Sequence, residues 1–450
     1  LEAKLEQLAN AENHDSQIVP FEELGVDQLF VDEAHNFKGM PITTRQGRTG
    51  GLSQGDSQRA VDMEMKTQYV QSLHGGDRGV VFATGTPLSN APVVEAYVML
   101  KYLAPNKLEE QGLKHFDDFV DAFGRITTES EFSLDGKTVK EKEKVSAFVN
   151  IPELMKLLRS VVDIVNPDQL DIPRPKPKYH MIDVDMSPAQ ERIMEMVAHE
   201  AATPPSREER NKYLTLTRIA KNACLTPRLL GFEDGGNKII RAVSEIKKVY
   251  DETAAERGAQ LVFTDIFNRA GGGTDEYIAA HITGGQEMPY ARGAYNLNEE
   301  IRSLLVTAGI PRDEIAIIQD IDKSKGDKDA NKSALFAKVR SGEVRVLIGS
   351  RPKMGEGTNV QERLAAIHLL HPGWKPSEDE QAIGRIIRFG NTYKEGQIFY
   401  YLTKGNANIG SYETKNHQLI GVKSKLIDQV MHGDDSVREI DMDESAMDRD

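Results

Sequence analysis

The sequence predicts an α/β protein with two parallel-sheet lobes, the first of them incomplete, and a helical insertion between them. Three observations predict this class. Two short apolar runs near the start of the chain end in acidic or glycine-containing turns, as the strands of open parallel sheets do. A longer series of such runs begins near residue 238, and helical patterning separates the two series.

The first lobe is predicted from two buried strands. Residues 28–31 (Gln-Leu-Phe-Val) lead directly into Asp32-Glu33, and residues 79–83 (Gly-Val-Val-Phe-Ala) lead into Thr-Gly-Thr-Pro at 84–87. Residues 39–57 are rich in Gly, Ser, Thr and Gln, which indicates a loop between the strands. Ligands bind at the carboxyl ends of strands in open α/β sheets, so both turns are candidate sites.

The middle of the chain carries a helical pattern with charged faces from about residue 93 to 162, which predicts a helical insertion from about residue 105. The proline-rich residues 168–177 end that pattern. The predicted domains are a partial first lobe at 1–180, a helical inter-lobe linker at 181–236, a second lobe at 237–425 and an acidic tail at 426–450.

The second lobe is predicted from a series of apolar runs with the length of buried strands. These runs are residues 259–264, 314–318, 344–348, 366–370 and 397–402. A glycine-rich stretch at 269–297 interrupts the series and reads as a surface insertion.

Composition narrows the class of protein. Hydrophobic residues make up 39% of the 450 residues, which is ordinary for a globular protein with sizeable cores. No signal peptide or membrane-spanning run is evident, and the single cysteine, Cys224, fits a reducing cytosol, so we expect a cytoplasmic protein without membrane contact. A net charge of −14 argues against a protein that coats nucleic acid non-specifically. It does not exclude a protein that binds the nucleic-acid backbone in one local basic groove.

The first chemical signal is Asp32-Glu33-Ala34-His35. A metal-bound triphosphate needs one carboxylate for Mg²⁺ and a second that orients or deprotonates the attacking water. Adjacent acids at a strand end suit these two tasks. A solvated acidic turn is the alternative interpretation of the tetrapeptide taken alone.

Three further motifs have structural as well as functional interpretations. Thr84 and Thr86 suit hydrogen bonding to the acidic motif, or an ordinary helix-capping turn. The glycines of residues 355–359 (Gly-Glu-Gly-Thr-Asn) allow close approach of backbone to a phosphate. Arg385 and Arg388 are three residues apart and would share a face of a helix. They suit the role of arginine fingers, or they belong to a solvated helix surface.

As a set, these motifs resemble helicase superfamily two, closest to the Swi/Snf type, over roughly residues 25–405. The resemblance assigns motif II to 32–35, motif III to 84–90, a helical segment to 97–105, an inter-lobe helix to 216–230, motif IV to 261–265, motif V to 355–359 and the end of motif V with motif VI to 373–391. Residues 35–39 (His-Asn-Phe-Lys-Gly) narrow it to the large methyltransferase–helicase proteins of phages and mobile elements. Those proteins carry a methyltransferase domain, which would lie elsewhere in a longer chain.

The resemblance implies two RecA-like lobes and a DNA-dependent ATPase that uses ATP and Mg²⁺. It implies that Asp32 holds Mg²⁺, that Glu33 activates water and that Arg385 and Arg388 reach the γ-phosphate. The nucleotide contacts would come from His35, Gln381, Gly355 and Gly357, and the coupling and nucleic-acid residues would be Thr84, Thr86, Thr358 and Asn359. DNA would be bound through its backbone, largely independent of sequence.

The chain also departs from the family pattern. The Walker A loop should precede Asp32, and the residues before it are too few, so we expect an N-terminally truncated motor with little ATPase activity of its own. The Gly-Lys-Thr at 136–138 has Glu131 in place of the first P-loop glycine, and Asn391 replaces a glutamine of motif VI. The rival interpretation is a non-hydrolysing module that keeps the helicase fold without a phosphate loop and binds DNA or protein. Strand separation and duplex translocation both stay open.

Overall fold

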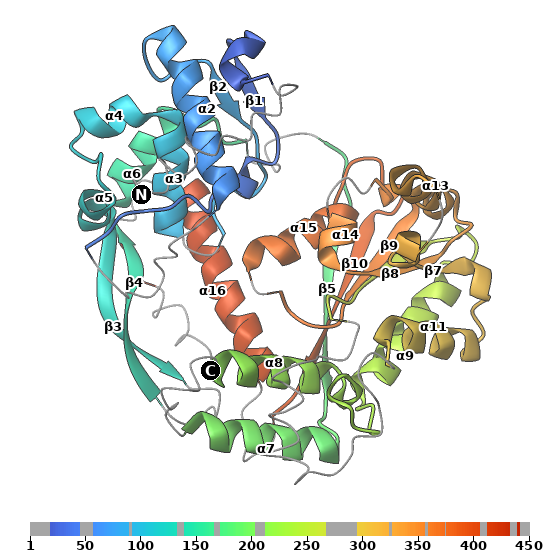
Figure 1. Cartoon of the computed structure of the whole chain (residues 1–450). Helices are drawn as coiled ribbons and strands as arrows, with labels where there is room; N and C mark the ends of the chain where they lie inside the picture. The colour runs from blue at the N-terminus through green and yellow to red at the C-terminus, as the bar shows by residue number, and fades with distance from the viewer. Residues whose placement is uncertain are drawn as a thin grey trace. The chain divides into compact units, whose positions relative to one another are not determined.

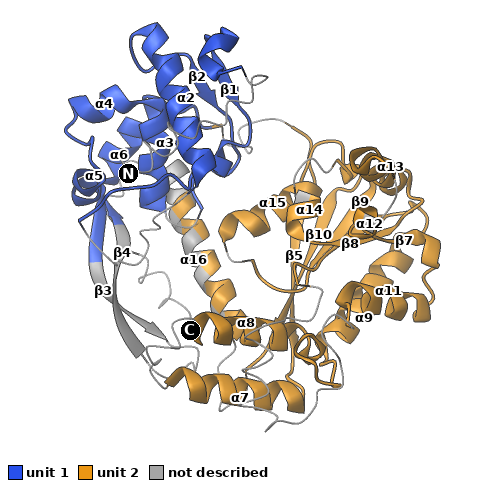
Figure 2. Cartoon of the chain, in the orientation of Figure 1, with its two compact units in different colours: residues 1–127, 143–164, 429–441 blue, residues 128–142, 165–428, 442–450 orange. Residues whose placement is uncertain are grey.

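The computed structural model divides the chain into two compact units, which we describe separately (Figure 2). The first comprises residues 1–127, 143–164 and 429–441, and the second 128–142, 165–428 and 442–450. The structure describes residues 19–45, 57–89, 92–132, 139–165, 172–202, 212–266, 295–323, 326–355, 359–373, 375–405, 412–432 and 439–441.

The first unit contains the two predicted strands, β1 (Leu29–Val31) and β2 (Val80–Phe82), which pair in parallel. Helix α2 (Gln58–His74) connects them, and α3 (Pro92–Leu103) follows β2 (Figure 1). The other helices of this unit are η1 (Phe21–Leu24), η2 (Ala34–Phe37), α4 (Pro105–Glu110), α5 (Phe116–Phe123) and α6 (Ile151–Arg159).

Tyr102, at the end of α3, fixes the segment that follows β1. The ring is almost fully buried, and its hydroxyl donates to the carbonyls of Phe37 at 3.1 Å and Ala60 at 2.8 Å. Burial, with a smaller contribution from the Glu64 charge, raises the pKa of the Tyr102 hydroxyl above its ordinary value, so it remains a donor. The short helix η2 is therefore held against α2 and α3.

The predicted helical insertion is wrong for residues 124–149. This stretch forms β3 (Gly124–Phe132) and β4 (Val139–Val149), in a sheet of order β11-β4-β3. Strand β11 (Glu439–Asp441), in the predicted acidic tail, pairs antiparallel with β4. Lys and Glu alternate at 140–144, and both are good helix formers, but a strict period of two suits a strand.

The second unit is built on a six-stranded parallel sheet of order β5-β10-β9-β6-β8-β7. The strands are β5 (Lys176–Val184), β6 (Ala259–Phe263), β7 (Ile315–Ile317), β8 (Val346–Gly349), β9 (Leu364–Leu369) and β10 (Glu395–Thr403). All five predicted strands are present. The sixth, β5, was not predicted and forms one edge of the sheet.

Helices cover both faces of this sheet, which confirms the α/β class (Figure 1). Along β6, Val262 packs under α9 (Lys238–Glu252) and α11 (Leu297–Thr307), while its neighbours Leu261 and Phe263 face the side covered by α13 (Lys328–Ser341) and α15 (Pro376–Ile386). The remaining helices are α7 (Pro188–Ala202), α8 (Lys212–Leu225), η4 (Pro227–Leu230), η5 (Arg312–Glu314), α12 (Asp320–Lys323), α14 (Arg351–Gly355), η6 (Gln361–Arg363) and α16 (Tyr412–His432). Among the described helices, none is both long and apolar enough to cross a bilayer.

A buried histidine lies in the centre of this sheet. His368 on β9 accepts at Nδ1 from the Tyr401 hydroxyl at 2.8 Å and donates from Nε2 to Gln260 Oε1 at 2.8 Å. Its ring also stacks on Phe399, with centroids 4.7 Å apart. Burial, helped by the charge of His180, lowers the pKa of His368 to about 3, so the ring is neutral at physiological pH.

Acid should therefore destabilise the second unit before its carboxylates titrate. A histidine in an unfolded chain has a pKa near 6.5. Below that pH, His368 therefore binds a proton in the unfolded chain but not in the folded chain. The stabilisation is complete above about pH 6.5 and is lost as the pH falls toward 3. We expect His368 alone to lower the free energy of unfolding by about 2 kcal/mol between pH 7 and 5, measured by urea unfolding. The variant His368→Gln should show a shallower slope, and an unchanged slope would contradict this assignment.

Candidate functional site

Strand β1 delivers Asp32 and Glu33 to its exposed carboxyl end. Glu33 has a φ of 50°, a left-handed conformation that costs a residue with a side chain about 1–2 kcal/mol. Its N–H donates to Asp32 Oδ1 at 2.9 Å, and the next residue, Ala34, donates to the Ala83 carbonyl at 3.0 Å. The surrounding bonds hold this strained turn in place, and strain of this kind clusters at functional sites.

The acidic motif touches the threonine motif through side chains. His35 Nδ1 lies 3.1 Å from Thr84 Oγ1 and 3.2 Å from Glu33 Oε2, so the ring sits between the two motifs. Thr84 Oγ1 also accepts from the N–H of Thr86 at 3.1 Å. The structure therefore brings together four of the predicted site residues, Glu33, His35, Thr84 and Thr86, within one unit.

The same contact has a second, buried part that the sequence analysis missed. Lys38 Nζ donates to the Thr86 carbonyl at 2.6 Å and to Ser89 Oγ at 3.3 Å, and lies 3.5 Å from Glu95 Oε2. Glu95, on α3, in turn accepts from the Ser89 hydroxyl at 2.8 Å and from the Ser89 N–H. Lys38 thus ties the end of η2 to the threonine turn. Its role depends on these tertiary contacts, and the signal in the sequence was its place within residues 35–39, the stretch that narrows the family resemblance.

Asp32 suits the binding of Mg²⁺ with a nucleotide. Its carboxylate is exposed at the end of a parallel strand, where ligands of open α/β sheets bind. Mg²⁺ in such sites is usually held by one or two carboxylates together with substrate phosphates and water. A single exposed aspartate beside Glu33 fits that donor set.

In the second unit the predicted residues lie on two segments. Gly355 ends α14, and the Asn359 carbonyl accepts from Arg340 Nη1 at 2.7 Å, which anchors the far side of the glycine motif. Gly357 and Thr358 lie outside the described residues. Gln381 and Arg385 are one turn apart on α15.

The predicted helix face shared by Arg385 and Arg388 is wrong, because α15 ends at Ile386. Arg388 lies beyond the helix and is exposed. Asn391 explains this end: its side-chain amide donates to the Ile386 carbonyl at 3.0 Å and to the Leu364 carbonyl at 2.9 Å. The asparagine that departs from the family pattern therefore caps the helix and fixes the turn that presents Arg388.

Comparison with known proteins supports the resemblance to helicases that the motifs indicate. Residues 1–165 match the family model described as "Probable helicase domain", which confirms that prediction for the part of the chain that carries motifs II and III. The Defense against restriction protein B of Escherichia phage P1 is 31% identical over 163 residues, which are 34% of this chain and 7% of that protein. The chain therefore spans only a small part of that relative's length.

Three solved structures are also similar. The Sulfolobus solfataricus SWI2/SNF2 ATPase core has 14% identity and a TM-score of 0.36, and the match covers 79% of this chain and 61% of that chain. The same core in complex with dsDNA has 14% identity and a TM-score of 0.36, covering 90% and 69%. The C-terminal part of the Fun30 ATPase domain has 16% identity and a TM-score of 0.29, covering 57% and 99%. At these scores the Swi/Snf type rests on the motifs rather than on the superpositions.

Proposed function

We propose that this chain is the main part of an ATP-dependent DNA motor of the Swi/Snf kind, which couples ATP hydrolysis to movement along DNA. The observation that carries the proposal is the contact between the acidic turn and the threonine turn, through His35 and Thr84 at 3.1 Å. A solvated acidic turn needs no such partner, whereas a motor must pass the state of its nucleotide site to the rest of the lobe. The family model and the motif order support the same interpretation.

Each residue has a defined task in the proposed cycle. Asp32 would hold Mg²⁺, which neutralises charge on the phosphates when it is bound. Glu33 would orient and deprotonate the attacking water, and His35 would pass the position of Glu33 to Thr84 and Thr86. Lys38, bonded to the Thr86 carbonyl at 2.6 Å, would keep the threonine turn in register during this step.

The second lobe would complete the reaction. Arg385 and Arg388 would stabilise the charge that develops on the γ-phosphate, and Gln381 would contact the nucleotide or position the arginines. Gly355 and Gly357 would approach the phosphates, while Thr358 and Asn359 would link the nucleotide to the DNA. These tasks require the two lobes to act on one ATP molecule.

The DNA contacts are proposed to be with phosphates. The chain carries a net charge of −14, so the contact must be confined to a local groove and should weaken steeply with salt. The match to a phage protein supports the narrower proposal that the chain belongs to a large protein of a phage or mobile element. On the resemblance of residues 35–39 alone, we propose that a methyltransferase domain lies elsewhere in that protein.

ATP turnover by the full-length protein tests the proposal. We expect duplex DNA of any sequence to stimulate hydrolysis, and stimulation to fall as salt rises from 50 to 200 mM, roughly in step with DNA affinity. Displacement of a triplex-forming strand from duplex DNA would report translocation, and an unwinding assay would report strand separation. DNA binding without turnover, in a full-length protein that has no phosphate loop, would favour the non-hydrolysing module instead.

A further inference from the structure

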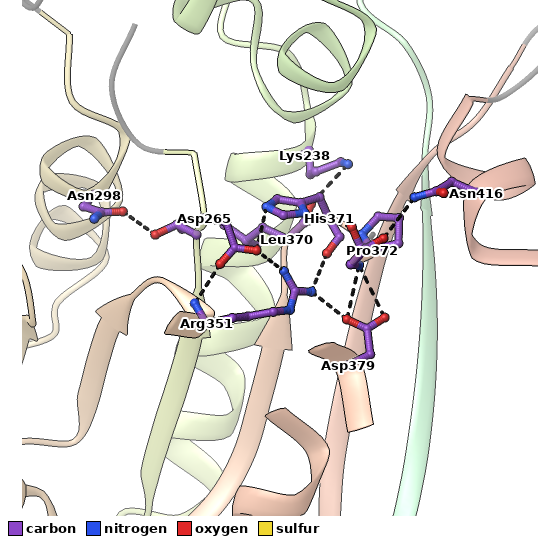
Figure 3. Close-up of polar contacts among 11 residues, drawn as sticks. Lys238, Asp265, Asn298, Arg351, Leu370, His371, Pro372, Asp379 and Asn416 are labelled. Carbon is purple, nitrogen blue, oxygen red and sulfur yellow. Dashed lines mark hydrogen bonds and ion pairs between the residues drawn. The ribbon is translucent and has the colours of Figure 1, made fainter. Parts of the chain in front are cut away.

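One buried arginine joins the strand ends of the second unit (Figure 3). Arg351 lies two residues after the end of β8, at the start of α14, and is 5% exposed. Its backbone N–H and its Nη1 both donate to the carboxylate of Asp265, which follows β6, and Nη2 donates to the His371 carbonyl, after β9, at 2.8 Å. A single side chain therefore bridges the carboxyl ends of three neighbouring strands.

The same guanidinium also holds the helix that carries Gln381 and Arg385. Arg351 Nη2 donates to Asp379 Oδ1 at 2.8 Å, and Asp379 lies in the first turn of α15. Asp379 Oδ1 accepts in addition from the Gly373 N–H at 3.2 Å. A Cβ at Gly373 would come within 3.1 Å of Asp379 Oδ1, so the loop before α15 packs tightly on this carboxylate.

The groups around Arg351 are charged as this arrangement requires. Burial by itself raises the pKa of Asp265, but the charge of Arg351 and the hydrogen bonds from Arg351 lower it to about 2, so the carboxylate is ionised at neutral pH. Burial, together with the charges of Lys221 and Arg351, lowers the pKa of His371 well below its ordinary value and keeps that ring neutral. The guanidinium therefore lies between two carboxylates, Asp265 and Asp379.

We infer that Arg351 is a positioning residue for the motor reaction: its planar fork sets α15, and with it Gln381, Arg385 and the adjoining Arg388, against the strand ends of the second lobe. The inference rests on the proposed function of those arginines. Three acceptors from three segments surround one rigid, planar donor group. Lysine keeps the charge but has no such fork, so it cannot satisfy them together.

The chain supplies a matched control at the opposite end of the same strand. Arg345 precedes β8, is 3% exposed, and donates to the carbonyls of Gly258 at 3.1 Å and Tyr250 at 2.6 Å. It also lies 3.7 Å above the Tyr250 ring. Arg345→Lys also removes a buried guanidinium that donates to backbone carbonyls, but this guanidinium does not contact α15. The variant therefore measures the structural cost of losing a buried guanidinium beside the same strand.

Hydrogen exchange of the 450-residue chain tests the geometric part of the inference. We expect Arg351→Lys to speed amide exchange in residues 376–386 by about tenfold or more, and Arg345→Lys to leave that segment unchanged while it speeds exchange at the start of β6 and the end of α9. Equal exchange of α15 in the two variants would overturn the inference. Asp379→Asn, which leaves Arg351 paired with Asp265, serves as the second variant should Arg351→Lys fail to fold.

ATP turnover by the full-length protein tests the functional part. Misplacement of a catalytic group by about 1 Å costs on the order of 10²-fold in rate, so Arg351→Lys and Asp379→Asn should lower kcat by roughly that factor with little change in the KM for ATP. Arg345→Lys should lower the melting temperature without this loss. Equal rates in Arg345→Lys and Arg351→Lys, with Arg388→Lys inactive, would overturn the inference alone, whereas an active Arg388→Lys would overturn the proposed function beneath it.

Discussion

Arg388→Lys in the full-length protein is expected to lower DNA-stimulated ATP turnover by roughly 10³- to 10⁵-fold, the range of arginine fingers in other phosphoryl-transfer enzymes. Lysine retains the charge but loses the planar donors that reach two phosphate oxygens together. Arg388 is exposed, beyond the end of α15, and lysine keeps its charge, so we expect the melting temperature to change little. Arg385→Lys should have a similar effect on turnover.

Three measurements on the same variant separate a finger from a surface arginine: the ATPase rate, the melting temperature and the DNA affinity at several salt concentrations. Arg241→Lys is the control, because this α9 side chain is 53% exposed and pairs with Glu245 one turn away. We expect that control to be nearly silent in all three. A lower melting temperature with unchanged specific activity in Arg388→Lys would mean that the arginine is structural.

Glu33→Gln is expected to lower hydrolysis by roughly 10²- to 10⁴-fold, the usual contribution of a general base, while ATP still binds. Glutamine keeps the size and hydrogen bonding of the side chain but cannot accept the proton of the attacking water. The variant should therefore hold ATP without turning it over. Single-turnover hydrolysis and equilibrium nucleotide binding measure the two effects independently.

The control for this variant is Glu23→Gln, in the first unit, where the glutamate is exposed on η1. It removes the same charge without touching β1 or its turn. Turnover close to the unmodified rate in Glu33→Gln would show that another group activates the water. Loss of ATP binding along with turnover would instead make Glu33 a nucleotide contact.

The strands that carry the site were predictable from sequence because each is a short apolar run ending in polar or glycine residues. Strand β5 was not, because it is an edge strand with exposed Tyr179 and Met181, and Pro177 near its start argues against a central strand. Residues 124–149 were misassigned because alternating Lys and Glu suit a helix by propensity and a strand by period. In each case, tertiary context overrode the local signal.

The candidate site likewise contains some residues that the sequence predicts and others that it does not. The chemistry of Asp32, Glu33 and Thr84 follows from residue type and from position at a strand end. Lys38 and Arg351 matter only through partners far along the chain, such as Glu95 and Asp379, and a single sequence contains no distances.

The pairing of β5 with β10 has a consequence for how the protein is made. Lys176 is in register with Glu395, so this edge of the six-stranded sheet joins segments from near the two ends of residues 165–428 of the second unit. At ordinary translation speeds of about 5–20 residues per second, β5 leaves the ribosome on the order of ten seconds or more before its partner exists. During that interval its apolar side chains have no sheet to join, and pairing this distant in sequence is slow to form. The nascent chain therefore carries β5 unpaired throughout that interval, and a chaperone that binds this strand would protect it until β10 is made.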